Sequence, residues 1–328
     1  MTEPRVVLLF PGQGSQFPGM GTELYGKEEE FTTAIDELFA AMGDLGGRLR
    51  TDWLTDPALP IDDGPRSQPL LFAVDYAIGR ALRARGLLPD VLVGHSIGEL
   101  AAAALAGVFD LGAAARILVG RARALRSSPP GGLLAVAAPR HAAVACVDSA
   151  WESAGVVVGA VNGPSQTVLA GPEPELSLAE GTIRAAGLAA RRVRATEPFH
   201  SPVLRPTALE WARTVAAEEL RPPRVSVWST RTGRPVTPQQ ATTPDFWAWQ
   251  LAEPVLFWPT LSDLLDEGDV TLVEAGPGKA LSMPARRHPS VREGRSRVIS
   301  LLPSSGPKTW ATWLAGIAAL GLSPVTTA

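Results

Sequence analysis

Ser96 lies in the segment Gly94-His95-Ser96-Ile97-Gly98, which fits the G-x-S-x-G pattern of a serine nucleophile. A nucleophile on a tight strand-to-helix turn needs small neighbours, and the N-terminus of the following helix stabilises negative charge beside it. We predict a buried strand at Val91–Val93 before the serine and a helix from Leu100 to Ala106 after it. The backbone N–H of Ile97 is then expected to face the oxyanion of a tetrahedral intermediate. This placement disfavours the alternative, in which Ser96 only caps a helix.

A serine nucleophile needs a base, and the chain offers four histidines: His95, His141, His200 and His288. The ring of His95 is expected to point away from the serine on so sharp a turn. His141 begins a predicted surface helix, and His288 lies in a polar stretch. His200 lies in the proline-flanked loop Glu197-Pro198-Phe199-His200-Ser201-Pro202, and loops held by a rigid scaffold commonly display catalytic bases. We therefore predict that His200 is the base; the alternative is an ordinary surface histidine.

The composition indicates a globular enzyme rather than a polyanion-binding protein. Of the 328 residues, 45% are hydrophobic and 19% charged, and the net charge of -3 lacks the basic footprint that nucleic acid or an anionic membrane requires. Cys146 is the only cysteine, so no intramolecular disulfide or cysteine-based zinc site is expected, and a small core side chain is the simplest role. Neither a signal peptide nor an apolar stretch of transmembrane length is recognised. These features predict a soluble, cytoplasmic, monomeric protein.

The hydrophobic pattern predicts a large α/β body with a small inserted subdomain that together position these residues. In the body, Val6–Phe10 is expected to be a buried strand that runs into a glycine-rich loop at Pro11–Gln16. From residue 131 to 195 the order strand, helix, strand, strand, helix, strand is that of a ferredoxin-like unit. Its predicted elements are Leu133–Val136, Arg140–Ser153, Val156–Val161, Thr167–Ala170, Leu176–Ala186 and Ala189–Val193. Residues 1–130 and 196–320 would form the catalytic body, and 321–328 a loose tail.

Other elements of the body follow from the same patterns. A helix is expected at 29–42, and a second helix is expected to have Pro69 near its first turn. Further strands are predicted at 225–228 and 270–274, and an amphipathic helix near the C-terminal end.

Several motifs resemble those of the malonyl-CoA:acyl-carrier-protein transacylases, which include the acyltransferase domains of polyketide synthases. The matching segments are Pro11-Gly12-Gln13-Gly14-Ser15-Gln16, Gly94-His95-Ser96-Ile97-Gly98-Glu99, Arg121, Ala160-Val161-Asn162-Gly163-Pro164 and Phe199-His200-Ser201. They follow the family's order and extend from about Val6 to Leu302. The resemblance implies an α/β-hydrolase-like body with a ferredoxin-like insert, and acyl transfer by a ping-pong route through an acyl-serine.

The resemblance also implies roles for individual residues. Ser96 would be the nucleophile and His200 its general base and acid. Gln13 would contribute its backbone N–H to the oxyanion hole together with Ile97. Gln250 resembles the residue whose main-chain carbonyl orients the imidazole, which would make a buried aspartate unnecessary.

Arg121 is the residue that bears on the acyl group. The family resemblance places it where malonyl-using members hold an arginine, whose planar fork suits a carboxylate through two parallel hydrogen bonds. Arg123 is expected on a different, solvated helical face. Bulky Phe199 and aliphatic Ile97 favour malonyl over methylmalonyl. The further residues expected to bind substrate are Pro198, Glu197 and Asn162. The alternative for Arg121 is an ordinary surface arginine.

One departure from the family keeps other functions open. The pair Glu197-Pro198 stands where malonyl-selective members often carry His-Ala. A carboxylate near the acyl pocket would repel a dicarboxylate or attract an amine. The alternatives are transfer of a larger or amino-bearing acyl group between carrier proteins, and a proofreading acyl hydrolase. More remote ones are an esterase and a non-enzymatic carrier-binding module.

The expected partners follow from this chemistry. A coenzyme A thioester would be the donor, with no bound metal or other cofactor. The acceptor would be the phosphopantetheine thiol of an acyl carrier protein. Because carrier proteins are acidic, their docking surface should be locally basic. The candidates for this surface are Arg140, Arg286 and Arg287, at the rim formed by the insert and the body.

Overall fold

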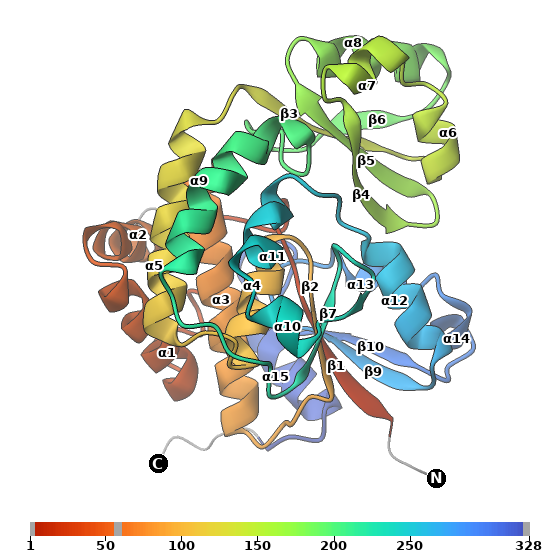
Figure 1. Cartoon of the computed structure of the whole chain (residues 1–328). Helices are drawn as coiled ribbons and strands as arrows, with labels where there is room; N and C mark the ends of the chain where they lie inside the picture. The colour runs from red at the N-terminus through yellow and green to blue at the C-terminus, as the bar shows by residue number, and fades with distance from the viewer. Residues whose placement is uncertain (1–3, 56–60, 324–328) are drawn as a thin grey trace.

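The computed structural model describes residues 4–55 and 61–323, and its strands form two separate sheets (Figure 1). The large sheet has the order β10-β9-β1-β2-β7-β8 and is parallel except for the last pair. Its strands are β1 (Arg5–Phe10), β2 (Val91–Gly94), β7 (Ser226–Ser229), β8 (Arg234–Pro235), β9 (Val270–Glu274) and β10 (Arg297–Ser300). Parallel strands covered on both faces have nearly continuous apolar sequences, which explains why β1, β2 and β9 could be predicted.

The register of the central strands brings distant segments of the sequence to one edge. Phe10 pairs with Gly94, and Gly94 pairs with Ser229. The carboxyl ends of parallel strands emerge side by side, so the loop after β1 and the turn after β2 are neighbours. The glycine-rich loop and the Ser96 turn therefore meet, although they lie far apart in the chain.

Helices surround the large sheet, and in Figure 1 α1, α3, α5 and α9 lie together on its left side. The body contains α1 (Glu29–Ala41), α2 (Asp44–Thr55), α3 (Gly64–Ala84), α4 (Ile97–Leu105), α5 (Leu111–Ala124), α9 (Arg205–Ala216), α10 (Pro238–Ala241), α11 (Pro244–Ala248), α12 (Phe257–Asp266), α13 (Ser282–Ala285), α14 (Pro289–Arg292) and α15 (Thr309–Ala319). Short 3-10 turns are η1 (Leu125–Ser127), η2 (Pro202–Leu204) and η3 (Trp249–Leu251). The large side chains of Trp211, Trp247 and Trp313 are fully buried among these helices.

The small sheet carries its own helices and forms a lobe above the body in Figure 1. It contains β3 (Gly131–Val136), β4 (Val157–Gly163), β5 (Gln166–Pro172) and β6 (Ala190–Arg192), with helices α6 (Arg140–Val144), α7 (Ser149–Ser153) and α8 (Glu175–Ala185). The order β4-β5-β3-β6 with antiparallel pairing is that of a ferredoxin-like unit. The predicted fold class, a parallel α/β body with this small sheet inside its sequence, is confirmed.

Two details differ from the prediction. The helix expected over 140–153 is broken into α6 and α7, because the Asp148 side chain accepts a hydrogen bond from the Ala150 N–H and starts a new helix. Pro69 lies inside α3 rather than near its first turn, since the helix begins earlier, at Gly64 with Pro65. Helix α15 supplies the expected C-terminal helix, but of the predicted tail only residues 321–323 lie within the described part.

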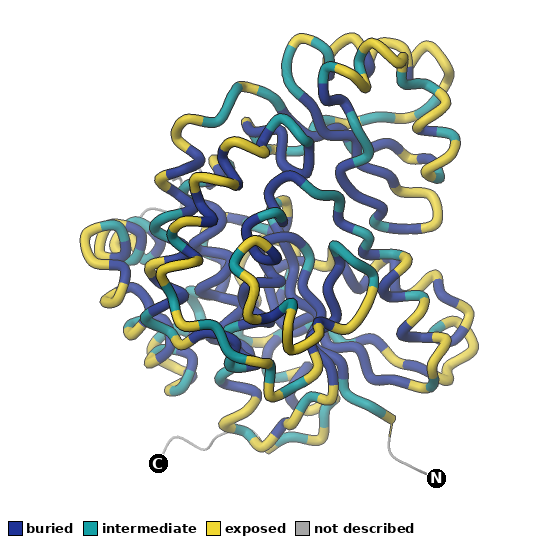
Figure 2. The backbone as a smooth tube through the Cα atoms, viewed as in Figure 1, coloured by how far each residue is buried: buried dark blue, intermediate teal, exposed yellow. Residues whose placement is uncertain are grey.

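The two lobes are joined by short contacts at the edge of β4. The Val161 N–H donates to the Val255 carbonyl, and the Val255 N–H donates to that of Gly159, both at 2.9 Å. Ser201 Oγ donates to the Gly155 carbonyl at 2.6 Å, and the serine is fully buried. Figure 2 shows the buried strands of both sheets in dark blue and the outer helices of the small lobe largely exposed. Among the described residues no helix has the length and apolarity that a membrane crossing needs.

The Ser201 contact predicts a measurable contribution to stability. Ser201→Ala removes the hydrogen bond to Gly155 and should lower the free energy of unfolding by about 1–2 kcal/mol. Ser153→Ala is the control, because the Ser153 hydroxyl donates to the Ser149 carbonyl on an exposed helix. This substitution should change the free energy of unfolding by less than about 0.5 kcal/mol. Urea denaturation followed by circular dichroism measures both. Equal effects of the two substitutions would show that Ser201 does not tie the lobes together.

Candidate active site

Ser96 sits on a strained turn between β2 and α4. Its backbone has φ 53° and ψ -122°, a region that side chains rarely adopt and that costs about 1–3 kcal/mol. A Cβ on Gly94 would lie 2.1 Å from the Glu99 nitrogen, and one on Gly98 would lie 2.2 Å from the Phe10 carbonyl oxygen. Both glycines of the motif are thus required by close backbone contact. Since Ile97 is the first residue of α4, its N–H has no acceptor inside the helix.

His200 is brought to Ser96 from the loop that returns from the small lobe. Its Nε2 lies 2.9 Å from Ser96 Oγ, across 104 residues of sequence. Its Nδ1 lies 2.9 Å from the Glu253 carbonyl oxygen. Because a carbonyl only accepts, Nδ1 carries the ring proton and Nε2 is free to accept the serine proton. His200 also has a positive φ of 66°, and its own N–H donates to the Leu251 carbonyl at 2.8 Å.

The ring of His200 is oriented by main-chain carbonyls of the turn in which Gln250 lies. The hydrogen bond from Nδ1 at 2.9 Å goes to Glu253, beyond the end of η3. The main-chain carbonyl of Gln250, the predicted partner, also interacts with the ring and raises the pKa of His200 less than that of Glu253 does. Gln250 also uses its side chain, which donates from Nε2 to the Ser96 carbonyl at 2.7 Å.

Burial keeps the base neutral. Desolvation, and then the neighbouring rings and charges of His95 and Arg121, lower the pKa of His200 to about 3, against smaller opposing effects of the Glu253 and Gln250 carbonyls. The imidazole is therefore uncharged at neutral pH and able to take a proton. Burial also lowers the pKa of His95.

Arg121 is a fully buried guanidinium without a carboxylate partner among the described residues. Its Nε donates to Gln68 Oε1 at 2.6 Å and its Nη1 to Gln250 Oε1 at 3.4 Å, while Nη2 has no partner. Its guanidinium also lies 4.6 Å from the centre of the Trp211 ring. Burial lowers the pKa of Arg121 to about 9, so it remains a cation at neutral pH. A buried cation left unpaired is costly, which makes the group an attractive site for an anion.

A small cavity of about 60 Å³ opens at the serine between the two lobes. From the body it is lined by Gln13, His95, Ser96, Phe199 and His200, and from the small lobe by residues that include Ala160, Asn162 and Val168. Phe199 is 2% exposed and limits the size of the cavity. The ring of His95 also faces this cavity, contrary to the expectation that it would point away. Its Nε2 lies 2.8 Å from Asn162 Oδ1, which holds it in place.

Three of the predicted substrate residues, Arg121, Pro198 and Glu197, are not among the residues that line this cavity. Pro198 packs against Gly131 at the start of β3, where a Cβ on the glycine would lie 2.7 Å from the proline. Glu197 lies beside Gly64 and the Phe199 ring, with one carboxylate oxygen unpaired. Burial raises the pKa of Glu197, and so does the nearby Asp63. The expectation that Pro198 and Glu197 would reach the acyl group is not met by this geometry.

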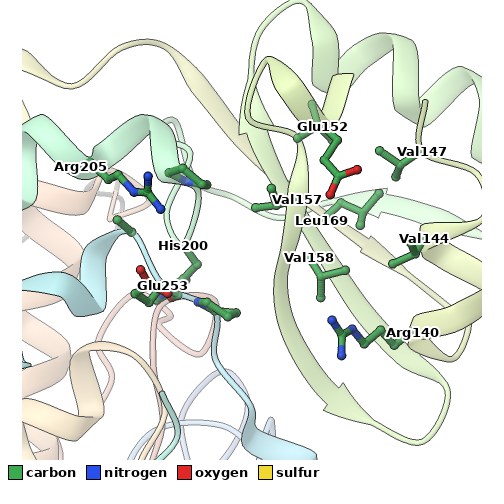
Figure 3. A pocket seen from close by; sticks show the side chains of 14 residues that line it. Arg140, Val144, Val147, Glu152, Val157, Val158, Leu169, His200, Arg205 and Glu253 are labelled. Atoms are coloured by element: carbon green, nitrogen blue, oxygen red, sulfur yellow. The ribbon is translucent and has the colours of Figure 1, made fainter. Parts of the chain in front are cut away.

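The three predicted docking arginines do not form one rim. Arg140 lines a groove of about 290 Å³ on one side of β4, with Arg205 and His200 across it (Figure 3). Arg287 lines a separate hollow of about 330 Å³ with Arg191 and Gln166, at the edge of the small sheet. Arg286 donates to the Val298 carbonyl at 3.1 Å. The basic side chains are thus divided between two faces of the lobe junction.

Two residues of the site escaped the prediction. Gln68 bonds Arg121 and also donates from Nε2 to Gln13 Oε1 at 3.0 Å, linking the arginine to the glycine-rich loop. The only sequence signal was its position directly before Pro69. The other is Glu253, which no pattern distinguishes because only its main-chain carbonyl is used.

Comparison with known proteins identifies the same architecture. A family model described as an acyl transferase domain matches residues 7–301. The chain is 36% identical over 289 residues to one component of the phenolphthiocerol/phthiocerol polyketide synthase of Mycobacterium tuberculosis, covering 88% of this chain and 19% of that protein. It is 33% identical over 291 residues to polyketide synthase GfsB of Streptomyces halstedii, covering 84% of this chain and 5% of that one. The chain therefore spans a small part of these relatives.

Solved structures resemble it over almost its whole length. The acyltransferase domain from the second module of the salinomycin polyketide synthase superposes with a TM-score of 0.88 at 33% identity, covering 99% of this chain and 75% of that one. The structure described as MCAT from Streptococcus pneumoniae has a TM-score of 0.83 at 24% identity, covering 96% and 100% of the two chains, and shares the fold.

The low pKa of His200 predicts an unusual pH profile for the serine. Loss of the neutral base as pH falls should slow the labelling of Ser96 by phenylmethylsulfonyl fluoride only well below pH 5. An ordinary histidine of pKa near 6.5 would already slow it about 30-fold at pH 5. Intact mass spectrometry of the adduct, from about pH 4.5 to 8, measures the rate, with Ser96→Ala as the unlabelled control and circular dichroism as a check on folding. A midpoint between about pH 6 and 7 would contradict the burial argument.

Proposed function

This chain belongs to the acyl transferase domain family, and we propose that it transfers a malonyl or closely related dicarboxylic acyl group from coenzyme A to an acyl carrier protein. The observation that carries the acyl assignment is the buried guanidinium of Arg121. It is held by two neutral amides, one of its nitrogens has no partner, and it lies in the network around Ser96. A simple acyl chain would leave this cation uncompensated, whereas a terminal carboxylate would pair with it.

The acylation step follows from the Ser96–His200 geometry. His200 Nε2 accepts the hydroxyl proton while Ser96 Oγ bonds to the thioester carbonyl carbon. The backbone N–H groups of Gln13 and Ile97 are proposed to stabilise the oxyanion. As the tetrahedral intermediate collapses, the carbon–sulfur bond breaks and the imidazolium returns its proton to the departing thiolate. The carbonyl of Glu253 stabilises the transient imidazolium through Nδ1, in the place that a buried aspartate occupies in a triad.

The second half of the reaction reverses these steps with a new thiol. His200 takes the proton of the phosphopantetheine thiol, and the thiol sulfur attacks the acyl-serine carbonyl. The bond between the acyl carbon and Ser96 Oγ then breaks, and His200 returns the proton to the serine oxygen. The small volume of the cavity favours a short acyl group, and the buried Phe199 side chain leaves little room for a branched one. This observation disfavours the larger acyl groups of the carrier-to-carrier alternative. The retained arginine disfavours the hydrolase.

Substitution of Arg121 tests the acyl assignment. Arg121→Ala should lower the kcat/KM for acylation by malonyl-CoA at least about 100-fold, because the carboxylate loses its buried partner. Uptake from acetyl-CoA should not fall. Arg123→Ala is the matched control on the exposed face of α5 and should behave as wild type. Intact mass records both adducts. Retention of malonyl uptake in Arg121→Ala, or an adduct obtained only from acyl carrier substrates, would reject the assignment.

Carrier docking is proposed at the hollow that contains Arg191 and Arg287. Both arginines are exposed. Arg191 lies two residues before Val193, which lines the Ser96 cavity, and Arg287 shares the hollow with Ser165, three residues after the cavity residue Asn162. Gly163, next to Asn162, packs against Pro284 near the end of α13. An acidic partner at this hollow would pair with both arginines near the Ser96 cavity.

Charge reversal distinguishes the two basic faces. The double variant Arg191→Glu/Arg287→Glu should slow transfer from the acyl-enzyme to an acidic carrier protein about tenfold. Transfer to the uncharged thiol N-acetylcysteamine should slow much less. Arg140→Glu, in the other groove, serves as the matched control. If Arg140→Glu is the defective variant instead, the carrier approaches along the groove of Figure 3.

A further inference from the structure

The Gln250 side chain connects the nucleophile turn to the buried arginine. Its Nε2 donates to the Ser96 carbonyl at 2.7 Å, and its Oε1 accepts from Arg121 Nη1 at 3.4 Å. The opposite orientation of the amide would set its NH₂ against the guanidinium and its oxygen against a carbonyl. Only one assignment is therefore chemically consistent. The residue is 4% exposed, so water does not readily replace either bond.

The hydrogen bonds of Arg121 leave one edge of its fork for a ligand. The short bond from Nε to Gln68 Oε1 closes the edge formed by Nε and Nη2. The end formed by Nη1 and Nη2 holds only the long bond to Gln250, since Nη2 has no partner. A carboxylate that binds both terminal nitrogens uses one of the two hydrogens of Nη1, the nitrogen that also donates to Gln250 Oε1. The ligand and the Gln250 amide thus share one donor nitrogen, and the long Gln250 bond is the weaker of the two.

The turn that carries Gln250 also holds the base. The next residue, Leu251, accepts the His200 N–H at 2.8 Å, and Glu253 accepts the ring proton. One short segment thus contacts the nucleophile, the base and the arginine. Because Ser96 has a strained backbone, the bond to its carbonyl helps to keep the hydroxyl at the position where His200 can accept its proton.

We propose that Gln250 is a positioning residue that couples the carboxylate site at Arg121 to the backbone of the Ser96 turn. The inference rests on the proposed function, since it takes the acyl carboxylate to be the ligand of Arg121. A dicarboxylic acyl group that occupies Nη1 and Nη2 shares Nη1 with Gln250 Oε1 and weakens that bond, while the amide stays bound to Ser96. Gln250 thereby acts on two properties at once, the reactivity of the serine and its preference for a carboxylate-bearing acyl group.

Gln250→Met tests the coupling, because methionine matches the shape of glutamine without its hydrogen bonds. Three reagents are compared by intact mass: phenylmethylsulfonyl fluoride, acetyl-CoA and malonyl-CoA. We expect labelling by the sulfonyl fluoride and acetylation to slow about threefold to tenfold through loss of the Ser96 contact. Malonylation should slow about tenfold more than acetylation, with most of the loss in kcat. Gln239→Met, on the exposed surface, should leave all three rates unchanged.

The outcomes separate the coupling from simpler roles. Equal losses with all three reagents would mean that Gln250 only supports the turn, and a loss confined to malonyl-CoA would mean that it only supports the arginine. Either result overturns the proposal. A wild-type protein that takes up no malonyl group would reject the proposed function alone. The labelling arm still tests the Ser96 contact in that case, since an unchanged labelling rate in Gln250→Met overturns the proposal. Thermal denaturation of each variant excludes a general loss of folding.

Discussion

The 2.9 Å contact between Ser96 Oγ and His200 Nε2 is the interaction on which the arrangement of the whole chain depends. Neither partner adopts a relaxed backbone, since both have positive φ values. Such conformations persist only where the surroundings fix them. At the serine, the surroundings are the close contacts of Gly94 and Gly98 and the bond from Gln250. At the histidine, they are the carbonyls of the 251–253 turn.

The placement of the small lobe follows from the same requirement. His200 lies in the segment that returns from this lobe, so the base can meet the serine only when the lobe is docked on the body. The pairing of β4 with Val255 and the bond from Ser201 to Gly155 hold this docking. The lobe also supplies Asn162 and other walls of the cavity. The insertion therefore helps to complete the site as well as to enclose it.

Charge at the site is distributed in an unusual way. Burial keeps the candidate base, His200, neutral, and a carbonyl rather than a carboxylate orients its ring. None of the described hydrogen-bond partners of the His200 ring is an anion. The buried cation beside it, Arg121, is held by amides that do not neutralise it. This arrangement is the basis of the proposed preference for an anionic acyl group. The physical reason is that desolvated charges interact strongly and are costly when left unpaired.

The sequence by itself determined the parts of this protein that depend on local pattern. The apolar runs of β1, β2 and β9, and the order of strands and helices along the chain in the small lobe, follow from side-chain periodicity. The nucleophile follows from a motif whose glycines are fixed by contacts within a few residues and with the neighbouring strand. His200 was chosen among four histidines because of its proline-flanked loop, and Arg121 was assigned through the family resemblance. The break between α6 and α7 was missed, although Asp148 is a good helix cap, since the apolar spacing continues across it.

Only the tertiary structure decided which groups meet. The contact of the imidazole Nδ1 with the Glu253 carbonyl depends on the path of a turn whose carbonyls all look alike in sequence. The bonds that Arg121 donates to Gln68 and Gln250 join residues 53 and 129 positions apart, and no local pattern marks them. The same holds for the separation of Arg140 from Arg287, which depends on how the small lobe sits on the body. Local periodicity fixes elements, whereas hydrogen bonds between distant main-chain and amide groups are set only when the elements pack.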